Sequence, residues 1–175
     1  MSLATPSRGR LVERPRHRDL DPGELEAYVR RLAARPDLWA HLVAHDPARR
    51  IYEELLRDDH LAVWLICWMD EHDTGYHDHD LSAGAVAVTA GTLCEERLAL
   101  GGAPVTRTVS AGSSFTFTAA DIHRVNHAGD GPAISLHAYS PPLRRMGAYE
   151  VGEGGALRRH AVSYEEELRP LSAAV

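Results

Sequence analysis

The feature that most restricts the fold of this chain is a series of short segments rich in β-branched and aromatic residues, separated by glycine-containing turns. These segments are residues 61–68, 85–89, 105–109, 114–118 and 134–139. They recur roughly every ten residues, a spacing typical of all-β domains. Turn signals such as Gly101-Gly102, Ala111-Gly112 and Gly129-Asp130-Gly131 lie between them. The pattern predicts a mainly β fold, an antiparallel barrel or sandwich, over residues 60–151.

The residues before this series have a helical pattern instead. Asp21 can cap a helix whose first position is Pro22, and Glu24 completes a capping box. Apolar residues follow at helical spacing: Leu25, Tyr28, Val29 and Leu32. A second Asp-Pro pair, Asp46-Pro47, precedes another apolar set: Ile51, Tyr52, Leu55 and Leu56. We therefore expect residues 21–59 to form a helical segment that packs on the barrel.

The two ends of the chain have weaker patterns. Residues 1–20 are polar and rich in arginine, with no apolar period, so a flexible arm is expected there. Residues 152–175 are weakly patterned, and we expect them to be a C-terminal tail of the same domain. The total of 175 residues suits a single domain.

Charge and composition exclude several classes of function. The chain has no lysine, and its 19 arginines against 25 acidic residues give a net charge of −6, which disfavours binding to nucleic acid or to an anionic membrane. No apolar run approaches the ~20 residues of a membrane span, and the N-terminus lacks the apolar core of a secretory signal. Two cysteines cannot form a disulfide framework. We expect a cytoplasmic protein without an obligate protein partner.

Histidine, with 11 residues, is the most informative residue type. His77 and His79 are two positions apart, so on a strand both side chains project from the same face. Two imidazoles on one face can hold a metal ion if a third ligand arrives from elsewhere. His123 follows the segment 114–118 and a turn of small residues, and a hairpin there could supply that ligand. The alternative for His77 and His79 alone is an ordinary polar loop.

A second polar pattern lies near the end of the series. Ser135, His137 and Tyr139 share one face of the predicted strand, with Leu136 and Ala138 on the other. On an inward face such a polar stripe is costly unless it is hydrogen-bonded or functional. The alternative is a solvated outer face of the sheet.

Taken together, these motifs resemble the cysteine dioxygenase family of cupins, the thiol dioxygenases, and in particular its bacterial branch. The first cupin motif corresponds to His77-x-His79 followed by Gly84 and Gly91, and the second runs from Gly112 to His123. The family's HRV and SLHxYSPP sequences are present as residues 123–125 and 135–142, and the Cys67-Trp68 pair also fits. The resemblance covers about half of the chain, residues 68–149.

The resemblance implies a cupin, a jelly-roll-like antiparallel β-barrel, with one Fe(II) per chain. His77, His79 and His123 would be the iron ligands. Ser135, His137 and Tyr139 would form a hydrogen-bonded catalytic relay, with the Tyr139 hydroxyl directed at the iron, and a cis peptide bond would follow at Ser140-Pro141. The implied reaction adds both atoms of O2 to the sulfur of a small thiol and gives a sulfinic acid. Three neutral imidazoles suit this chemistry, because they leave the full metal charge for a soft thiolate.

Two departures from the family bear on the substrate. Gly84 stands where most cupins have a glutamate ligand and where the mammalian family members have a cysteine cross-linked to the tyrosine. The arginine with which the mammalian enzymes bind the cysteine carboxylate is also missing, because its position holds Ile51 or Glu53. The remaining substrate-binding candidates are Tyr52, Arg50, Glu53 and Arg144. Cysteine, 3-mercaptopropionate and a larger thiol such as ergothioneine are all compatible, and Glu53 would favour a cationic group on the substrate.

Two other functions stay open. One is another metal-dependent cupin enzyme that acts on a carbon substrate, although such an enzyme has no need of the Ser-x-His-x-Tyr stripe. The other is a cupin that binds a small molecule without catalysis. A sensor of that kind would usually carry a DNA-binding or partner domain, and the sequence shows no pattern for either.

Overall fold

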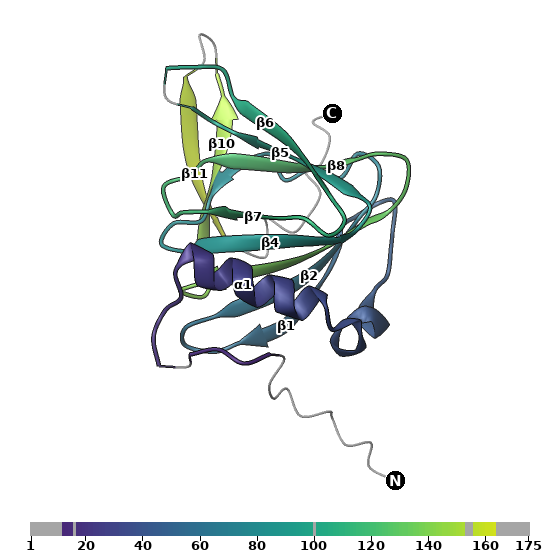
Figure 1. Cartoon of the computed structure of the whole chain (residues 1–175). Helices are drawn as coiled ribbons and strands as arrows, with labels where there is room; N and C mark the ends of the chain where they lie inside the picture. The colour runs from purple at the N-terminus through teal and green to yellow at the C-terminus, as the bar shows by residue number, and fades with distance from the viewer. Residues whose placement is uncertain (1–11, 16, 100, 153–155, 164–175) are drawn as a thin grey trace.

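The computed structural model describes residues 12–15, 17–99, 101–152 and 156–163. Within these residues, two antiparallel sheets face each other as a barrel, and one α-helix covers the outer face of the first sheet (Figure 1). In spatial order the first sheet is β1 (Ile51–Arg57), β2 (Ala62–Trp68), β9 (Ala133–Ser140), β4 (Ala83–Ala90) and β7 (Ser114–Phe117). The second sheet is β11 (Leu157–Ser163), β10 (Arg145–Val151), β3 (Tyr76–Asp78), β8 (His123–Ala128), β5 (Thr92–Arg97) and β6 (Val105–Ser110). This architecture confirms the predicted jelly-roll-like cupin barrel.

The continuous apolar run in β2 is explained by burial on both faces of this strand. Trp64, Ile66 and Trp68 point into the inner core between the sheets. Val63 and Leu65 alternate with them and join the outer core beneath the helix. A strand that is covered on both faces needs apolar residues at every position, which is the pattern of residues 61–68.

The helix α1 (Pro22–Ala33) begins where the capping signals predict. The Asp21 side chain accepts a hydrogen bond from the Glu24 backbone N–H at 2.9 Å, and the Glu24 carboxylate accepts one from the Asp21 N–H at 3.1 Å. The apolar stripe of the helix is fully buried against the outer face of the first sheet: Leu25, Tyr28, Val29 and Leu32. None of the helices within the described residues is long and apolar enough to cross a membrane.

The prediction of helix over residues 21–59 is wrong in its second half. After α1 the chain forms two short 3-10 helices, η1 (Pro36–Leu38) and η2 (Ala40–Leu42), and Ile51 begins strand β1. A register shift between Glu54 and Leu56 interrupts the alternation of this strand. The irregularity places Leu55 and Leu56 together against the outer core. Two adjacent leucines that both face the outer core imitate helical spacing, which is why the sequence pattern was misleading.

The two ends of the chain are also more ordered than expected. Residues 12–15 and 17–20 pack on the barrel, because Leu20 is buried and its N–H donates to Ser140 Oγ at 2.8 Å, and Arg14 forms an ion pair with Asp58. The expected flexible arm is therefore wrong for these residues, while residues 1–11 and 16 lie outside the described part. In the expected tail, residues 157–163 form β11 and pair with β10, and residues 164–175 are not described.

Candidate metal centre

The two sheets bring the three predicted metal ligands together inside the barrel. His77 lies on β3 directly opposite His123 at the start of β8, and His79 follows β3 by one residue. All three are buried, and one nitrogen from each ring lies within 4.8 Å of the others. The ring centroids are 4.7–5.1 Å apart. The two histidines that their spacing placed on one face, and the third that a hairpin was expected to supply, are therefore close in space.

Hydrogen bonds fix the tautomers of two of these rings. His77 Nδ1 lies 3.0 Å from the Gly75 carbonyl and His123 Nδ1 lies 2.9 Å from Glu95 Oε1. Because both partners are acceptors, each Nδ1 carries the proton and each Nε2 keeps a lone pair for a metal. The third ring has a buried Nδ1 with no hydrogen-bond partner among the described residues, that of His79.

Burial keeps two of these three rings, those of His79 and His123, uncharged near neutral pH. It lowers the pKa of His79 well below its ordinary value, and the neighbouring histidines add to the effect. Burial also lowers the pKa of His123 to about 4, although the Glu95 carboxylate acts in the opposite direction. Neutral imidazole is the form that binds metal ions. The donor set therefore fits a divalent transition metal with three nitrogen ligands.

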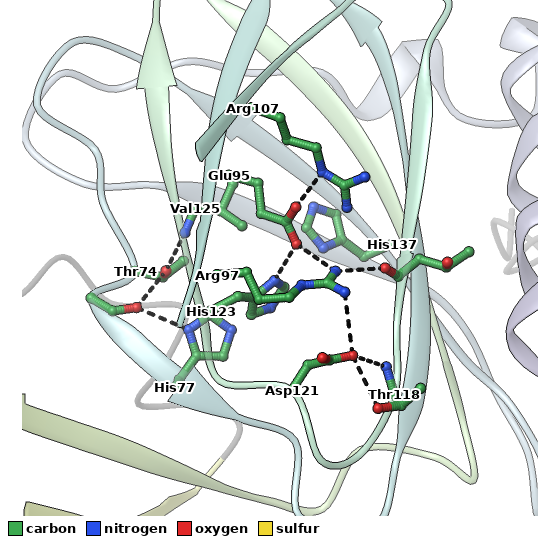
Figure 2. Close-up of polar contacts among 12 residues, drawn as sticks. Thr74, His77, Glu95, Arg97, Arg107, Thr118, Asp121, His123, Val125 and His137 are labelled. Carbon is green, nitrogen blue, oxygen red and sulfur yellow. Dashed lines mark hydrogen bonds and ion pairs between the residues drawn. The ribbon is translucent and has the colours of Figure 1, made fainter. Parts of the chain in front are cut away.

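Glu95 is the residue that orients His123, and the sequence analysis did not identify it. Its buried carboxylate accepts hydrogen bonds from His123, from Arg97 at 2.9 Å and from Arg107 (Figure 2). Burial alone would raise the pKa of Glu95, but these three donors outweigh it and lower the pKa to about 2. Arg97 extends the network to Asp121, at 3.5 Å, beside the turn that leads into β8 (Figure 2). The sequence held one signal of this network, because Glu95 and Arg97 are two positions apart and therefore share one face of a strand.

Asp78, the residue between His77 and His79, points away from the histidine cluster and ties β3 to its neighbouring strands. Asp78 accepts hydrogen bonds from Arg159 at 2.7 and 2.9 Å and from the Tyr149 hydroxyl at 2.6 Å. Although burial would raise the pKa of Asp78, these bonds hold the pKa well below its ordinary value. A side chain at Gly147 would displace the Asp78 carboxylate or the Arg159 guanidinium, so glycine leaves room for this ion pair. The network uses β10 and β11 to hold the strand that carries His77 in place.

The position of Gly84 explains the missing fourth ligand. A Cβ atom on this residue would overlap the ring of Phe117, which pairs with it across β4 and β7. The Phe117 ring in turn packs against the rings of His79 and His123, with centroids 4.2 and 4.7 Å away. An aromatic ring therefore occupies the space into which a side chain at position 84 would project.

The Ser-x-His-x-Tyr stripe lies on the inner face of β9, as expected from its spacing. Ser135 Oγ is 2.7 Å from His137 Nε2, and His137 Nδ1 is 3.2 Å from the Tyr139 hydroxyl. The Tyr139 ring centroid lies 5.3 Å from that of His79, so the stripe ends beside the histidine cluster. The Ser140-Pro141 peptide bond that follows is cis. A further contact that the sequence did not suggest is the hydrogen bond from Trp68 Nε1 to Ser135 Oγ, at 2.8 Å.

Two spaces of very different size adjoin the histidines. A cavity of about 10 Å³ lies among the three rings, His137, Tyr139 and the apolar side chains around them, and this is about the room of one water molecule. His79 also lines a surface cleft of about 500 Å³, together with Asp59, Asp80, Leu81, Ser82, Pro141, Pro142, Arg144 and Arg145. His79 therefore separates the interior cavity from a cleft that a small molecule could enter.

The four predicted substrate-binding residues occupy different places. Tyr52 lies on the inner face of β1, edge-on to Trp64 with ring centroids 5.8 Å apart. Arg50 is buried, and its guanidinium lies 5.2 Å from the centre of the Trp68 ring. Arg144 is exposed on the wall of the cleft.

The fourth of these residues, Glu53, points away from the cavity. It is exposed and pairs with Leu65, whose side chain belongs to the outer core. The prediction that Glu53 contacts the substrate therefore disagrees with its position on the outer face of β1. The cause is the strand itself, whose alternation turns Glu53 and Tyr52 to opposite faces.

The irregularity in β1 instead directs an arginine that the sequence analysis overlooked. After the register shift Arg57 pairs with Ala62, and Ala62 pairs with Tyr139 on its other side. The Arg57 guanidinium lies 5.8 Å from the centre of the Trp64 ring, on the inner side of the sheet. Its Nε donates to Glu54 at 2.7 Å. Bulges of this kind often redirect a side chain next to an active site.

The barrel with three inward-facing histidines defines the class of protein, a metal-dependent cupin. Within that class, the family description "Cysteine dioxygenase type I" matches residues 10–151, so the chain belongs to the cysteine dioxygenase type I family. Membership of this family implies a dioxygenase. No curated protein matches the sequence.

Two solved structures support the fold. TT1209 from Thermus thermophilus is 14% identical with a TM-score of 0.53, and the match covers 59% of this chain and 93% of that one. An uncharacterised protein with a double-stranded β-helix domain from Klebsiella pneumoniae subsp. pneumoniae is 16% identical with a TM-score of 0.52, over 58% of this chain and 80% of that one. Both similarities concern the barrel architecture.

Proposed function

We propose that this protein is a non-haem iron thiol dioxygenase that converts a small thiol and O2 into a sulfinic acid. Both oxygen atoms form new bonds to sulfur, the oxidation of sulfur balances the reduction of O2, and the thiol proton ends on the sulfinic acid. The observation that carries the proposal is the hydrogen-bonded stripe that ends at Tyr139 beside the buried histidine cluster, in a chain of the cysteine dioxygenase family. Gly84, in place of a cross-linked cysteine, is why we assign the chain to the bacterial branch.

One Fe(II) per chain would be held by His77, His79 and His123. When bound, it would supply a site for the thiolate and for O2 and would lower the pKa of the thiol. The ligands contribute no charge, so the substrate thiolate is the group that neutralises the centre. The fixed tautomers of His77 and His123 keep both rings ready to bind without rearrangement.

The protein side chains would bind the substrate and exclude water. Phe117, Val86 and Val125 line the cavity beside the histidines and keep it apolar. The Tyr139 hydroxyl is the polar group that this wall offers to a bound substrate. The interior cavity has room for little more than the thiol group itself, which favours a small thiol, and the cleft that His79 lines is the surface space from which the substrate would enter.

Arg57 is our candidate for recognition of a carboxylate on the substrate. It shares one cross-strand row with Ala62 and Tyr139 on the inner face of the first sheet, and the small Ala62 stands between the two larger residues in that row. A planar guanidinium binds a carboxylate through two parallel hydrogen bonds. Arg57 also donates to the Leu143 carbonyl at 3.1 Å. Glu54, its acidic partner, would then face an ammonium group, which cysteine has and 3-mercaptopropionate lacks. These contacts favour cysteine over 3-mercaptopropionate, and both over the larger ergothioneine. Arg50, Tyr52 and Arg144 are then secondary candidates.

The test combines metal analysis with a screen of thiols. Anaerobically purified protein should contain close to one iron per chain, and an oxygen electrode should record uptake with one or more of cysteine, 3-mercaptopropionate, cysteamine and ergothioneine. Alanine at His77, His79 or His123 should abolish iron binding, whereas alanine at the exposed His41 should not. Tyr139→Phe should impair turnover and leave the metal content intact.

Full occupancy by zinc without thiol-dependent oxygen uptake would contradict the proposal. Oxygen uptake with a carbon substrate alone would favour another cupin dioxygenase instead. The cytoplasmic location expected from the sequence stays a prediction.

A further inference from the structure

We propose that Trp68 is a positioning residue that sets the direction of the hydrogen bonds along the stripe, so that Tyr139 presents its hydroxyl proton to the cavity. The geometry of four buried side chains determines which atom donates each proton along the stripe. The meaning of this proton direction for catalysis rests on the proposed function, in which Tyr139 contacts the bound substrate.

The first step concerns the hydroxyl of Ser135. Trp68 and Ser135 are both completely buried, and the indole Nε1 lies 2.8 Å from Ser135 Oγ. An indole N–H can donate but never accept, so Ser135 Oγ must be the acceptor in this bond. The hydroxyl has a single proton, and its other neighbour is His137 Nε2, at 2.7 Å. The hydroxyl proton is therefore directed to His137.

The second step concerns the tautomer of His137. Burial lowers the pKa of this residue to about 3, with His123 and Arg50 adding to the effect, so the ring is neutral at neutral pH. A neutral imidazole has one N–H group. Because Nε2 accepts from Ser135, the proton must lie on Nδ1, which is 3.2 Å from the Tyr139 hydroxyl oxygen. His137 therefore donates to Tyr139.

The third step follows for Tyr139. Its oxygen accepts the His137 proton, so its own proton is not used in that bond and can be directed into the cavity. The reverse arrangement is chemically possible for the same three residues. If Ser135 accepted from His137 Nε2–H, then Nδ1 would accept from Tyr139, and the tyrosine proton would point away from the cavity. In that arrangement Ser135 Oγ would accept from both Trp68 and His137, and its own buried proton would have no acceptor among the described residues. The donor-only indole of Trp68 therefore disfavours this alternative.

The surroundings of Trp68 hold the indole in the required orientation. Its ring stacks on that of His137, with centroids 6.3 Å apart and an interplanar angle of 26°. The Arg50 guanidinium lies 5.2 Å from the centre of the Trp68 indole ring, a cation–π geometry. This contact gives buried Arg50 a role in supporting Trp68, a different role from the substrate binding expected from the sequence.

Nitrogen NMR of the histidines tests the proposal directly. The sample is the full chain, loaded with diamagnetic Zn2+ and labelled with 15N at histidine, and the His137 signals are assigned by their loss in His137→Gln. A protonated ring nitrogen and an unprotonated one differ widely in 15N chemical shift. We expect Nδ1 to be the protonated nitrogen and Nε2 the unprotonated one. A protonated Nε2 overturns the proposal, and this measurement needs no variant of Trp68.

The variant Trp68→Phe keeps an aromatic ring and removes the N–H donor. We expect the two His137 nitrogen shifts to move toward each other as both tautomers become populated. In the iron-loaded enzyme, kcat should fall about tenfold with KM changed less than about twofold, because one oriented hydrogen bond is lost in the reaction step. A tautomer identical to wild type in Trp68→Phe would reduce Trp68 to a packing role and overturn the proposal.

Trp39→Phe is the matched control. Trp39 also donates a buried indole N–H, at 3.0 Å to the Leu32 carbonyl, but in the outer core under the helix. The Trp39→Phe variant should lose about as much stability as Trp68→Phe, while its His137 15N chemical shifts and its kcat stay at wild-type values. Because the nitrogen shifts are read without turnover, they remain decisive even if the protein oxidises no thiol, which separates failure of this proposal from failure of the proposed function.

Discussion

Replacing Glu95 by glutamine tests whether a buried carboxylate holds a metal ligand in place. The carboxylate is 2% exposed and accepts hydrogen bonds from His123, Arg97 and Arg107. Glutamine has the same shape but offers one acceptor oxygen, and its amide group turns N–H donors toward one of these three partners. The depression of the Glu95 pKa from 4.5 to about 2 corresponds to about 3 kcal/mol of stabilisation. Loss of one member of a buried charge pair has a cost of about 3–5 kcal/mol.

We therefore expect Glu95→Gln to lose about 3 kcal/mol of unfolding free energy and to bind metal about 10–100-fold more weakly. Urea denaturation of the metal-free protein measures the first quantity, and competition with a chelator of known affinity measures the second. Glu96→Gln is the control, because Glu96 is the adjacent residue and therefore faces the other side of β5, and we expect it to stay within about 0.5 kcal/mol of wild type. Equal metal affinity and stability in the two variants would refute the orienting role of Glu95.

Three more predictions concern the cavity and its walls. Arg57→Met should raise KM for a carboxylate-bearing thiol about 10–100-fold with little change in kcat. Arg144→Met should leave KM near wild type, and a larger effect there would place recognition at the cleft instead. The metal-free protein should lose stability as the pH falls from about 6.5 toward about 4, because His123 stays neutral in the folded state while it takes up a proton when unfolded. Urea denaturation over this pH range checks the sign, and greater stability in acid would contradict it. Gly84→Ala should cost about 1–3 kcal/mol through overlap with Phe117, and thermal unfolding of the double variant with Phe117→Leu should show partial recovery, whereas simple additivity would argue against the overlap.

Much of the barrel could be predicted because strand alternation and turns are local properties. The spacing of His77 and His79 placed both on one face of a strand before any pairing was known. The spacing also placed Ser135, His137 and Tyr139 on one face of a strand, while the choice between an inward and a solvated face stayed open until the structure showed it. Such patterns depend on two-residue periodicity, which the sequence displays directly.

Features that depend on pairing between distant strands were not accessible in this way. The role of Glu95 depends on the register that sets β5 beside β8, so that its carboxylate meets His123. The inward direction of Arg57 depends on the irregularity in β1, and that irregularity also made the segment look helical. A single displaced residue in a strand reverses the faces of every residue after it. The substrate side of the site was therefore the hardest part to predict.

The same strand register gives Gly84 a structural role, beyond the absence of a fourth metal ligand at this position. One cross-strand row of the first sheet contains Arg57, Ala62, Tyr139, Gly84 and Phe117, in that spatial order. Large side chains alternate with small ones along this row, so each large side chain has a neighbour over which it can extend. The Phe117 ring uses the space above Gly84 to reach His79 and His123, and the small Ala62 stands between Arg57 and Tyr139 at the other end of the row. A larger residue at either small position would fill the room that the site needs, because side chains on one face of adjacent strands are only about 5 Å apart. The small residues of this row thus determine the shape of the cavity, while the large ones determine its chemistry.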